Sequence, residues 1–163
     1  MPSSSAVGLR SVVIAFVTVC GFGVGNLAAA PPSFSGSGFV VHPEGYVVTA
    51  TKAVGFSSER MKLEDSFCEV VLGDTSYIAH VISQDKSGGL ALLRIDATEL
   101  PWLPLAEAAA VELGTQVRGF GHPAVWVPDR SADLTRGMVS RVAADSVLVD
   151  AEAKPGNAGG PFV

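Results

Sequence analysis

The chain has 163 residues, 48% of them hydrophobic and 17% charged, and a formal net charge of −5 at pH 7. This balance excludes a disordered or coiled-coil chain, and an acidic protein without a basic cluster is not expected to bind nucleic acid. Together with 18 glycines and 10 prolines, the length favours one turn-rich β domain.

Residues 1–30 have the pattern of an export or anchoring segment. A mostly apolar run covers Val12–Val19, and Ala28–Ala30 supplies the small residues of a signal-peptidase site. The one arginine before this run gives too little basic character for a mitochondrial transit peptide. Pro31 makes a poor cleavage junction, and residues 11–30 are nearly long enough to span a bilayer. We therefore expect an exported protein, periplasmic or extracellular, with a retained membrane anchor as the alternative.

The chain contains 2 cysteines, and Cys20 lies in the apolar N-terminal segment. Cys68 is then the single cysteine of the expected mature domain, so an intrachain disulfide is not expected there. A reactive thiol and an intermolecular link are the alternatives for Cys68. We expect instead a small buried hydrophobe on a strand, because free cysteine is among the most buried residue types.

After an expected linker over residues 31–36, the sequence predicts short strands separated by turns. Pro43–Gly45 and Gly73–Thr75 each lie between two apolar stretches, a pattern typical of hairpins. Residues 97–112 hold two prolines around a tryptophan and predict a connection between two groups of strands. No later segment offers a long, capped amphipathic helix, so a barrel or sandwich is expected. The expected strands are Phe39–His42, Tyr46–Ala50, Cys68–Leu72, Tyr77–Ser83, Leu90–Ile95, Thr115–Gly121, Thr135–Val142 and Ser146–Asp150.

The last ten residues, KPGNAGGPFV, predict a loop that turns sharply. Pro155 restricts one backbone angle, and Gly156, Gly159 and Gly160 tolerate conformations that other residues avoid. Such a loop can direct several N–H groups at one point and so bind an anion, as in the oxyanion sites of acyl-transfer enzymes. An ordinary glycine-rich turn is the alternative interpretation of so short a pattern.

The terminal GNAGGP resembles the GNSGGP loop of trypsin-like serine proteases, most closely the HtrA/Deg (Do-like) branch. Four further segments are similar to that family, and all five are collinear from about residue 35 to the end. These segments are SGSGFVVHPEGYVVTATKAV (Ser35–Val54), VVLGDTSYIAHVISQDKSGGLALLRID (Val70–Asp96), LPWLPLAEAAAVELGTQVRGFGHP (Leu100–Pro123) and TRGMVSRV (Thr135–Val142).

The resemblance implies an all-β fold, the trypsin-like double β-barrel, over residues 37–163. It places the first barrel at 37–96, the crossover at 97–112 and part of the second barrel at 113–163. Family members continue past GGP through strands that close the second barrel, and often into a PDZ domain. Because the sequence stops at Val163, we expect the second barrel to be incomplete, with an open edge that favours self-association.

The resemblance also locates the catalytic triad and shows that all three positions are substituted. The family's histidine, usually in NHV, falls on Lys52 of TKAV; its aspartate, usually opening DLALL, falls on Gly89; its serine falls on Ala158. The chemistry needs a hydroxyl, a base and a carboxylate that orients the base. We therefore expect a catalytically inactive homologue, a pseudoprotease. The alternatives are a serine endopeptidase of protein quality control that acts through unrecognised groups, and a truncated, non-functional fragment.

Lys52 does not supply an evident replacement base. A lysine base needs desolvation or a neighbouring cation, and it needs a hydroxyl within reach. Ala158 has no hydroxyl, and Thr51 on a strand or turn is expected to point elsewhere. We expect Lys52 to be a solvated lysine at the rim of a cleft.

The histidines and tryptophans are not expected to form a second site. His42, His80 and His122 match no catalytic position and show no metal-ligand spacing with each other or with a cysteine. We expect no metal and no cofactor. Trp102 and Trp126 could line a peptide groove, but packing is commoner for isolated tryptophans.

Peptide binding does not require the triad. The resemblance assigns an oxyanion-hole-like set of backbone N–H groups to Gly156, Asn157 and Ala158. An extended or unfolded peptide can add to a sheet edge through main-chain hydrogen bonds. The expected partners are therefore such peptides and a second copy of the chain, with membrane contact only through residues 11–30.

Overall fold

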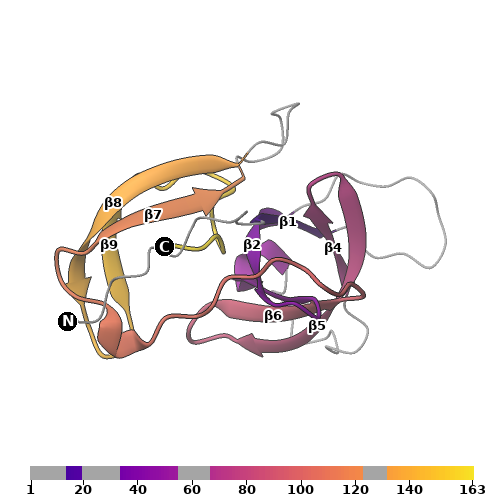
Figure 1. Cartoon of the computed structure of the whole chain (residues 1–163), viewed down its shortest axis with the longest axis horizontal. Helices are drawn as coiled ribbons and strands as arrows, with labels where there is room; N and C mark the ends of the chain where they lie inside the picture. Colours follow the sequence, from indigo (N-terminus) through magenta and orange to yellow (C-terminus); the bar gives the residue numbers. More distant parts are fainter. Residues whose placement is uncertain (1–13, 20–33, 55–66, 123–131) are drawn as a thin grey trace.

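The computed structural model describes residues 14–19, 34–54, 67–122 and 132–163, which form two antiparallel sheets (Figure 1). No helix of the described residues is long and apolar enough to cross a membrane. Their helical elements are two short 3-10 turns, η1 Thr51–Val54 and η3 Ala108–Ala110. The strands are β1 Ile14–Val19, β2 Phe34–His42, β3 Tyr46–Ala50, β4 Phe67–Leu72, β5 Thr75–Asp85, β6 Leu90–Ile95, β7 Gln116–Gly121, β8 Asp133–Val142 and β9 Val147–Ala151.

The first sheet is a closed barrel with the strand order β1-β2-β3-β6-β5-β4. Both predicted hairpins are present, and each turn uses a glycine with positive φ: Gly45 at 90° and Gly73 at 59°. A side chain would be strained in either conformation, so these two glycines define where the strands reverse. The predicted Leu90–Ile95 is observed as β6 with the same bounds.

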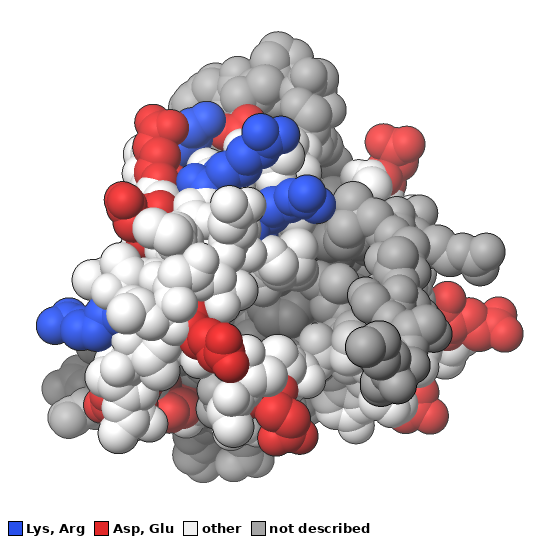
Figure 2. All heavy atoms as spheres, turned by 60° about the vertical axis from the view of Figure 1, so that its left-hand side comes forward, with Lys and Arg blue, Asp and Glu red and all other residues white. Residues whose placement is uncertain are grey.

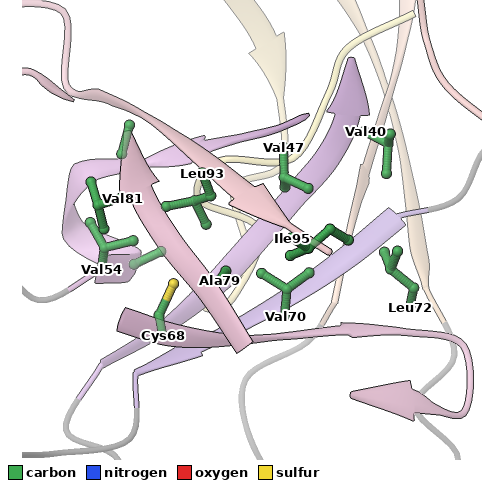
Figure 3. Packing of buried hydrophobic residues seen from close by; sticks show 12 residues of the cluster. Val40, Val47, Val54, Cys68, Val70, Leu72, Ala79, Val81, Leu93 and Ile95 are labelled. Carbon is green, nitrogen blue, oxygen red and sulfur yellow. The ribbon is translucent and has the colours of Figure 1, made fainter. Parts of the chain in front are cut away.

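The core of the barrel consists of apolar side chains from β2 to β6 and from η1, which converge in Figure 3. Alternate residues of β3 are buried, as period-2 patterning requires when one face of a strand packs on a core. Val47, Val70 and Leu93 are 0% exposed. Cys68 is 2% exposed among them, which confirms the prediction of a small buried hydrophobe on a strand.

β1 was not predicted from the sequence. It pairs with β2 from Ile14↔Phe39 to Val19↔Phe34, and with β4 from Ala15↔Leu72 to Thr18↔Glu69. Six residues of the predicted export segment therefore lie in the barrel, and β2 begins inside the predicted linker 31–36. The interpretation of 34–36 as a linker was wrong. The apolar run was ambiguous because a short stretch of Ile, Val and Phe suits an export segment and a buried strand equally well.

The second sheet contains β7, β8 and β9 in an open row, so the described residues form the expected all-β fold with an incomplete second barrel. The connection between the two sheets runs from the end of β6 at Ile95 to the start of β7 at Gln116 and includes the predicted connection 97–112. The last residues return along β7, where Phe162 bridges Gly119. One face of this sheet borders a cavity of about 570 Å³, lined by apolar side chains that include Val117, Val139 and Val149. The second sheet thus borders a cavity on one face, whereas the first barrel surrounds a packed core.

Charge is distributed unevenly over the side of the molecule that carries the second sheet. Figure 2 shows its basic side chains gathered mainly in the upper part, with acidic side chains in several places around them. No continuous basic surface is visible on this face of the described residues, in keeping with the net charge of −5.

Candidate functional site

The site is built around the loop that follows β9. Asn157 N donates to Lys154 O at 3.1 Å, and Gly160 N donates to Asn157 O at 3.0 Å, so the loop makes two successive turns. Gly156 has a φ of 95° and Gly159 a φ of 90°, which only glycine adopts readily. A Cβ on Gly159 would also collide with the backbone of the first barrel. The glycines are therefore needed both for the turn and for close packing against β2 and β3.

One serine of β2 holds this loop in place. Ser37 N donates to Ala158 O at 2.9 Å, and Ser37 Oγ donates to Gly156 O at 2.7 Å. The same hydroxyl accepts a hydrogen bond from His122 N at 2.8 Å, and Thr49 Oγ1 donates to Ser37 O at 2.6 Å. Ser37 is 0% exposed, so these bonds form where water does not compete. The sequence analysis did not identify Ser37; its signal was a small polar residue between two glycines.

The structure brings Lys52, Gly89 and Ala158 to one region. Thr51, the residue before Lys52, donates its N–H to Gly89 O at 2.8 Å. A Cβ built on Gly36 would lie 2.6 Å from Ala53 Cβ and 2.8 Å from Ala158 O, so η1 and the terminal loop meet at that glycine. Residues separated by more than a hundred positions thus lie close together where η1, the turn before β6 and the terminal loop meet.

Lys52, Gly89 and Ala158 do not form the pair of a base and an orienting acid that a catalytic triad needs. Ala158 presents a methyl group, and Gly89 has a φ of 70° with nothing within 4 Å of a built Cβ. Lys52 is exposed and forms no hydrogen bond or ion pair with another described residue. The exposure of Lys52 agrees with the expectation of a solvated lysine, and its position at the rim of a cleft stays a prediction.

The nearest acid in sequence to Gly89 is engaged elsewhere. Asp85 Oδ1 accepts hydrogen bonds from Ser87 Oγ at 2.6 Å and from Ser87 N at 3.0 Å, which closes the turn before β6. The hydrogen bond from the Ser87 side chain holds the pKa of Asp85 below its ordinary value. This carboxylate stabilises its own turn.

The histidines lie at three separate places. His42 Nδ1 is 3.8 Å from Glu44 Oε2 at the end of β2, and His80 is exposed on β5. His122 follows β7 and donates its backbone N–H to Ser37. None occupies the position of Lys52, as predicted. Trp102 is 49% exposed and lines a groove of about 1480 Å³, whereas Trp126 lies outside the described residues.

Cys68 is not available as an alternative nucleophile. Burial in the barrel core raises the pKa of its thiol from 9.0 to about 12. The thiolate is the reactive form, so at neutral pH this cysteine is chemically inert.

The backbone of the loop still presents hydrogen-bond donors. The N–H groups of Gly156 and Ala158 donate to no other described residue, whereas the N–H of Asn157 bonds within the loop. N–H groups without a partner in a glycine-rich turn can bind an anion by donating hydrogen bonds to it. The structure therefore leaves two of the three predicted oxyanion-hole donors unoccupied within the described part of the chain.

Comparison with known proteins agrees with this geometry. The family model described as Trypsin-like peptidase domain matches residues 36–163. Protease Do-like 1, chloroplastic, of Arabidopsis thaliana is 32% identical over 147 residues, covering 81% of this chain and 31% of the relative. A probable periplasmic serine endoprotease DegP-like of Pseudomonas putida is 31% identical over 136 residues, covering 78% of this chain and 26% of the relative.

The fold has a counterpart among solved structures. The crystal structure of the serine endoprotease from Yersinia pestis superimposes with a TM-score of 0.71 at 24% identity, covering 93% of this chain and 49% of that chain. The chain spans about a quarter to a third of the curated relatives, 26% and 31% of the two above. The chain belongs to the trypsin-like peptidase family, and its relatives are Do-like and DegP-like proteases.

Proposed function

We propose that this protein is a pseudoprotease: a non-catalytic member of its family that binds extended peptides in the cleft beside the terminal loop. The observation that carries the proposal is Ala158, which stands where the GNSGGP pattern has its nucleophile. Without a hydroxyl or thiol at that position, no acyl-enzyme can form there. Backbone groups alone retain only the residual assistance of an oxyanion site, roughly 10³–10⁴-fold over water.

The other two substitutions support the same conclusion. Gly89 lies in the left-handed region at a φ of 70°, where L side chains other than Asn and Asp are rare. Lys52 is charged, exposed and without a carboxylate partner among the described residues. A histidine base needs an orienting acid, and neither group is present at these positions.

The binding half of the proposal rests on backbone geometry. Ser37 and Thr49 keep the loop folded against the first barrel by hydrogen bonds that involve no member of the triad. A bound segment would use main-chain hydrogen bonds to strand edges and to the N–H groups of Gly156 and Ala158. The open edge of the second sheet also supports self-association as part of this proposal.

Export is a further part of the proposal. Several bacterial relatives are named periplasmic endoproteases. The pairing of β1 with both β2 and β4 argues that residues 14–19 remain in the folded protein after export. A signal-peptidase cut after Ala30 would remove a strand of the barrel.

Activity-based labelling tests the catalytic half. The protein should show no turnover of unfolded casein and no labelling by a fluorophosphonate probe, with an active DegP-like relative as the positive control. Ala158→Ser alone should also fail, because the triad acts as a unit. The triple variant with Lys52→His, Gly89→Asp and Ala158→Ser is expected to regain labelling, because Asp is among the residues that tolerate a φ of 70° best and nothing lies within 4 Å of a Cβ built on Gly89. Labelling of the unmodified protein at a cleft hydroxyl would overturn the proposal.

A further inference from the structure

The charge of the cleft differs from that of the catalytic set implied by the family resemblance. At the matched positions Gly89 replaces a carboxylate and Lys52 replaces an imidazole, so this set has lost an acid and gained a permanent cation. Lys52 precedes Ala53 in η1, and a Cβ built on Gly36 would lie 2.6 Å from Ala53 Cβ and 2.8 Å from Ala158 O, so the turn that carries the cation meets the terminal loop. Lys52 is exposed and forms no ion pair with another described residue. Lys154, the other lysine of this region, is 3.2 Å from Asp133 and therefore already has an acidic partner. An uncompensated cation favours an anionic ligand over a neutral amide.

Peptide geometry determines where the N–H of Ala158 points. None of the described peptide bonds is cis, and in a trans peptide the C=O and N–H point to opposite sides. Asn157 O points into the loop, where it accepts a hydrogen bond from Gly160 N at 3.0 Å. The N–H of Ala158 therefore points out of the loop. The N–H of Gly156, two residues earlier in the same loop, also has no backbone partner among the described residues, and two such N–H groups in a glycine-rich turn can bind an anion together, as a nest.

Ser37 restrains the two peptide planes on either side of that N–H. Its hydroxyl binds Gly156 O at 2.7 Å, and its own N–H binds Ala158 O at 2.9 Å. The plane between them, which carries the N–H of Ala158, has little freedom left to rotate. Because Ser37 is fully buried and also receives the His122 N–H, its hydroxyl has no solvent alternative.

The side chain of Ala158 leaves this nest accessible. The residue is exposed, and its methyl group offers no hydroxyl that would compete for the donors. A carboxylate can accept both N–H bonds and the attraction of a nearby cation at once. Charge-assisted hydrogen bonds of this kind are about twice as strong as neutral ones.

We propose that the cleft captures the carboxylate of a peptide chain end. The amide N–H groups of Gly156 and Ala158 are the donors, Lys52 supplies the countercharge, and Ser37 is the positioning residue. Backbone nests capture C-terminal carboxylates in other recognition modes. The peptide part of the ligand rests on the proposed function, whereas the carboxylate part rests on the nest and the lysine.

The test compares three forms of one apolar hexapeptide: the free acid, its C-terminal amide, and the amide with one internal glutamate. Binding is measured by calorimetry and by the ¹⁵N–¹H shifts of Gly156 and Ala158 in the full chain. The free acid should bind at least about tenfold more tightly than the amide, the scale of one charge-assisted hydrogen bond. It should shift both amide signals. Preference for the internal glutamate instead would overturn the assignment to a chain end.

Two variants separate the charge from the nest. Lys52→Gln should reduce the preference for the free acid, whereas Arg141→Gln, an exposed charge at the end of β8, should not. Ser37→Ala should abolish the preference and the shift of Ala158, whereas Thr135→Val, which removes another buried hydroxyl, should leave both intact. If Ser37→Ala does not fold, Ser37→Cys replaces it, because the thiol keeps the side-chain shape but is a weak donor.

The possible failures are distinguishable. Equal binding of acid and amide overturns the carboxylate site and leaves peptide binding standing. If no peptide binds, the proposed function fails, and titration with acetate decides the carboxylate site. Absence of a saturable acetate shift at Gly156 and Ala158 then overturns the inference.

Discussion

The first barrel and the second sheet contain similar strands, but the first sheet is closed and the second is open. In the first, six strands form a cycle and surround a core of twelve buried residues. In the second, three strands lie in an open row. Among the described residues of these three strands, Val139 is the only one with a buried apolar side chain. Both halves contain strands of similar length and valine content. Closure, which lets two faces of apolar side chains meet, is what separates a core from a lined cavity.

The contrast predicts that removal of β1 has the largest effect on the molecule. Deleting residues 1–30, the product of the predicted cleavage, would leave facing edges of β2 and β4 unpaired. We expect the free energy of unfolding of the first barrel to fall by at least about 5 kcal/mol, the scale of a whole small domain. Chemical denaturation followed by tryptophan fluorescence and circular dichroism measures this change.

Deletion of residues 1–10 is the matched control, because it leaves β1 intact. If the 31–163 fragment unfolds as cooperatively as the full chain, β1 is not needed to close the barrel. Residues 1–30 would then be interpreted again as an export segment that can be removed.

Hydrogen exchange should be slower in the closed barrel than in the open sheet. Amides of β3 and β6 are paired on both sides of each strand inside the closed barrel. Amides of β9 lie at the edge of an open sheet and should exchange by local opening. We expect opening free energies for β9 to be lower by about 3 kcal/mol or more. Uniform protection across both sheets would show that the second sheet closes or is covered in solution.

A pair of identical substitutions compares the two interiors directly. Val70 is 0% exposed in the barrel core, and Val139 is 1% exposed beside the cavity of about 570 Å³. Val70→Ala should lower the free energy of unfolding by about 2–3 kcal/mol, from lost transfer energy plus a new void. Val139→Ala should cost about half as much, because its surroundings already border open space. Equal losses in urea melts would contradict the proposed difference in packing.

The smallest expected effect is a pH dependence that arises from Cys68. Its pKa is about 12 in the folded protein against 9.0 for the free thiol, so above pH 9 the unfolded chain loses a proton that the folded chain keeps. Stability from this group is complete below pH 9 and declines as the pH rises toward 12. By pH 10 the loss should be about 1 kcal/mol.

Cys68→Ala provides the control for this pH profile. The substitution lowers stability overall but should remove the part of the slope between pH 9 and 10 that belongs to the thiol. An unchanged slope would assign the pH dependence to other groups.

Much of the fold could be predicted because its signals are local. The hairpins around Gly45 and Gly73 follow from turn residues between apolar strands, and β6 follows from a continuous apolar run. A collinear family pattern sufficed to match Lys52, Gly89 and Ala158 to the triad positions, and the backbone contacts of Thr51 with Gly89 and of the terminal loop with η1 bring these segments together. β1 escaped prediction because a six-residue apolar stretch carries the same pattern in an export segment and in a buried strand.

The identities of the residues at the candidate site follow from the sequence alone, and with them the lack of a nucleophile at Ala158. The turns follow from the sequence as well, because only glycine readily adopts the backbone angles found at Gly156 and Gly159. Only the tertiary structure decided that Ser37 holds the terminal loop, since its hydrogen bonds to Gly156 and His122 span 119 and 85 positions. Only the tertiary structure decided the role of Ile14–Val19, because a strand is stabilised by the edges that it pairs with, and those edges lie elsewhere in the chain.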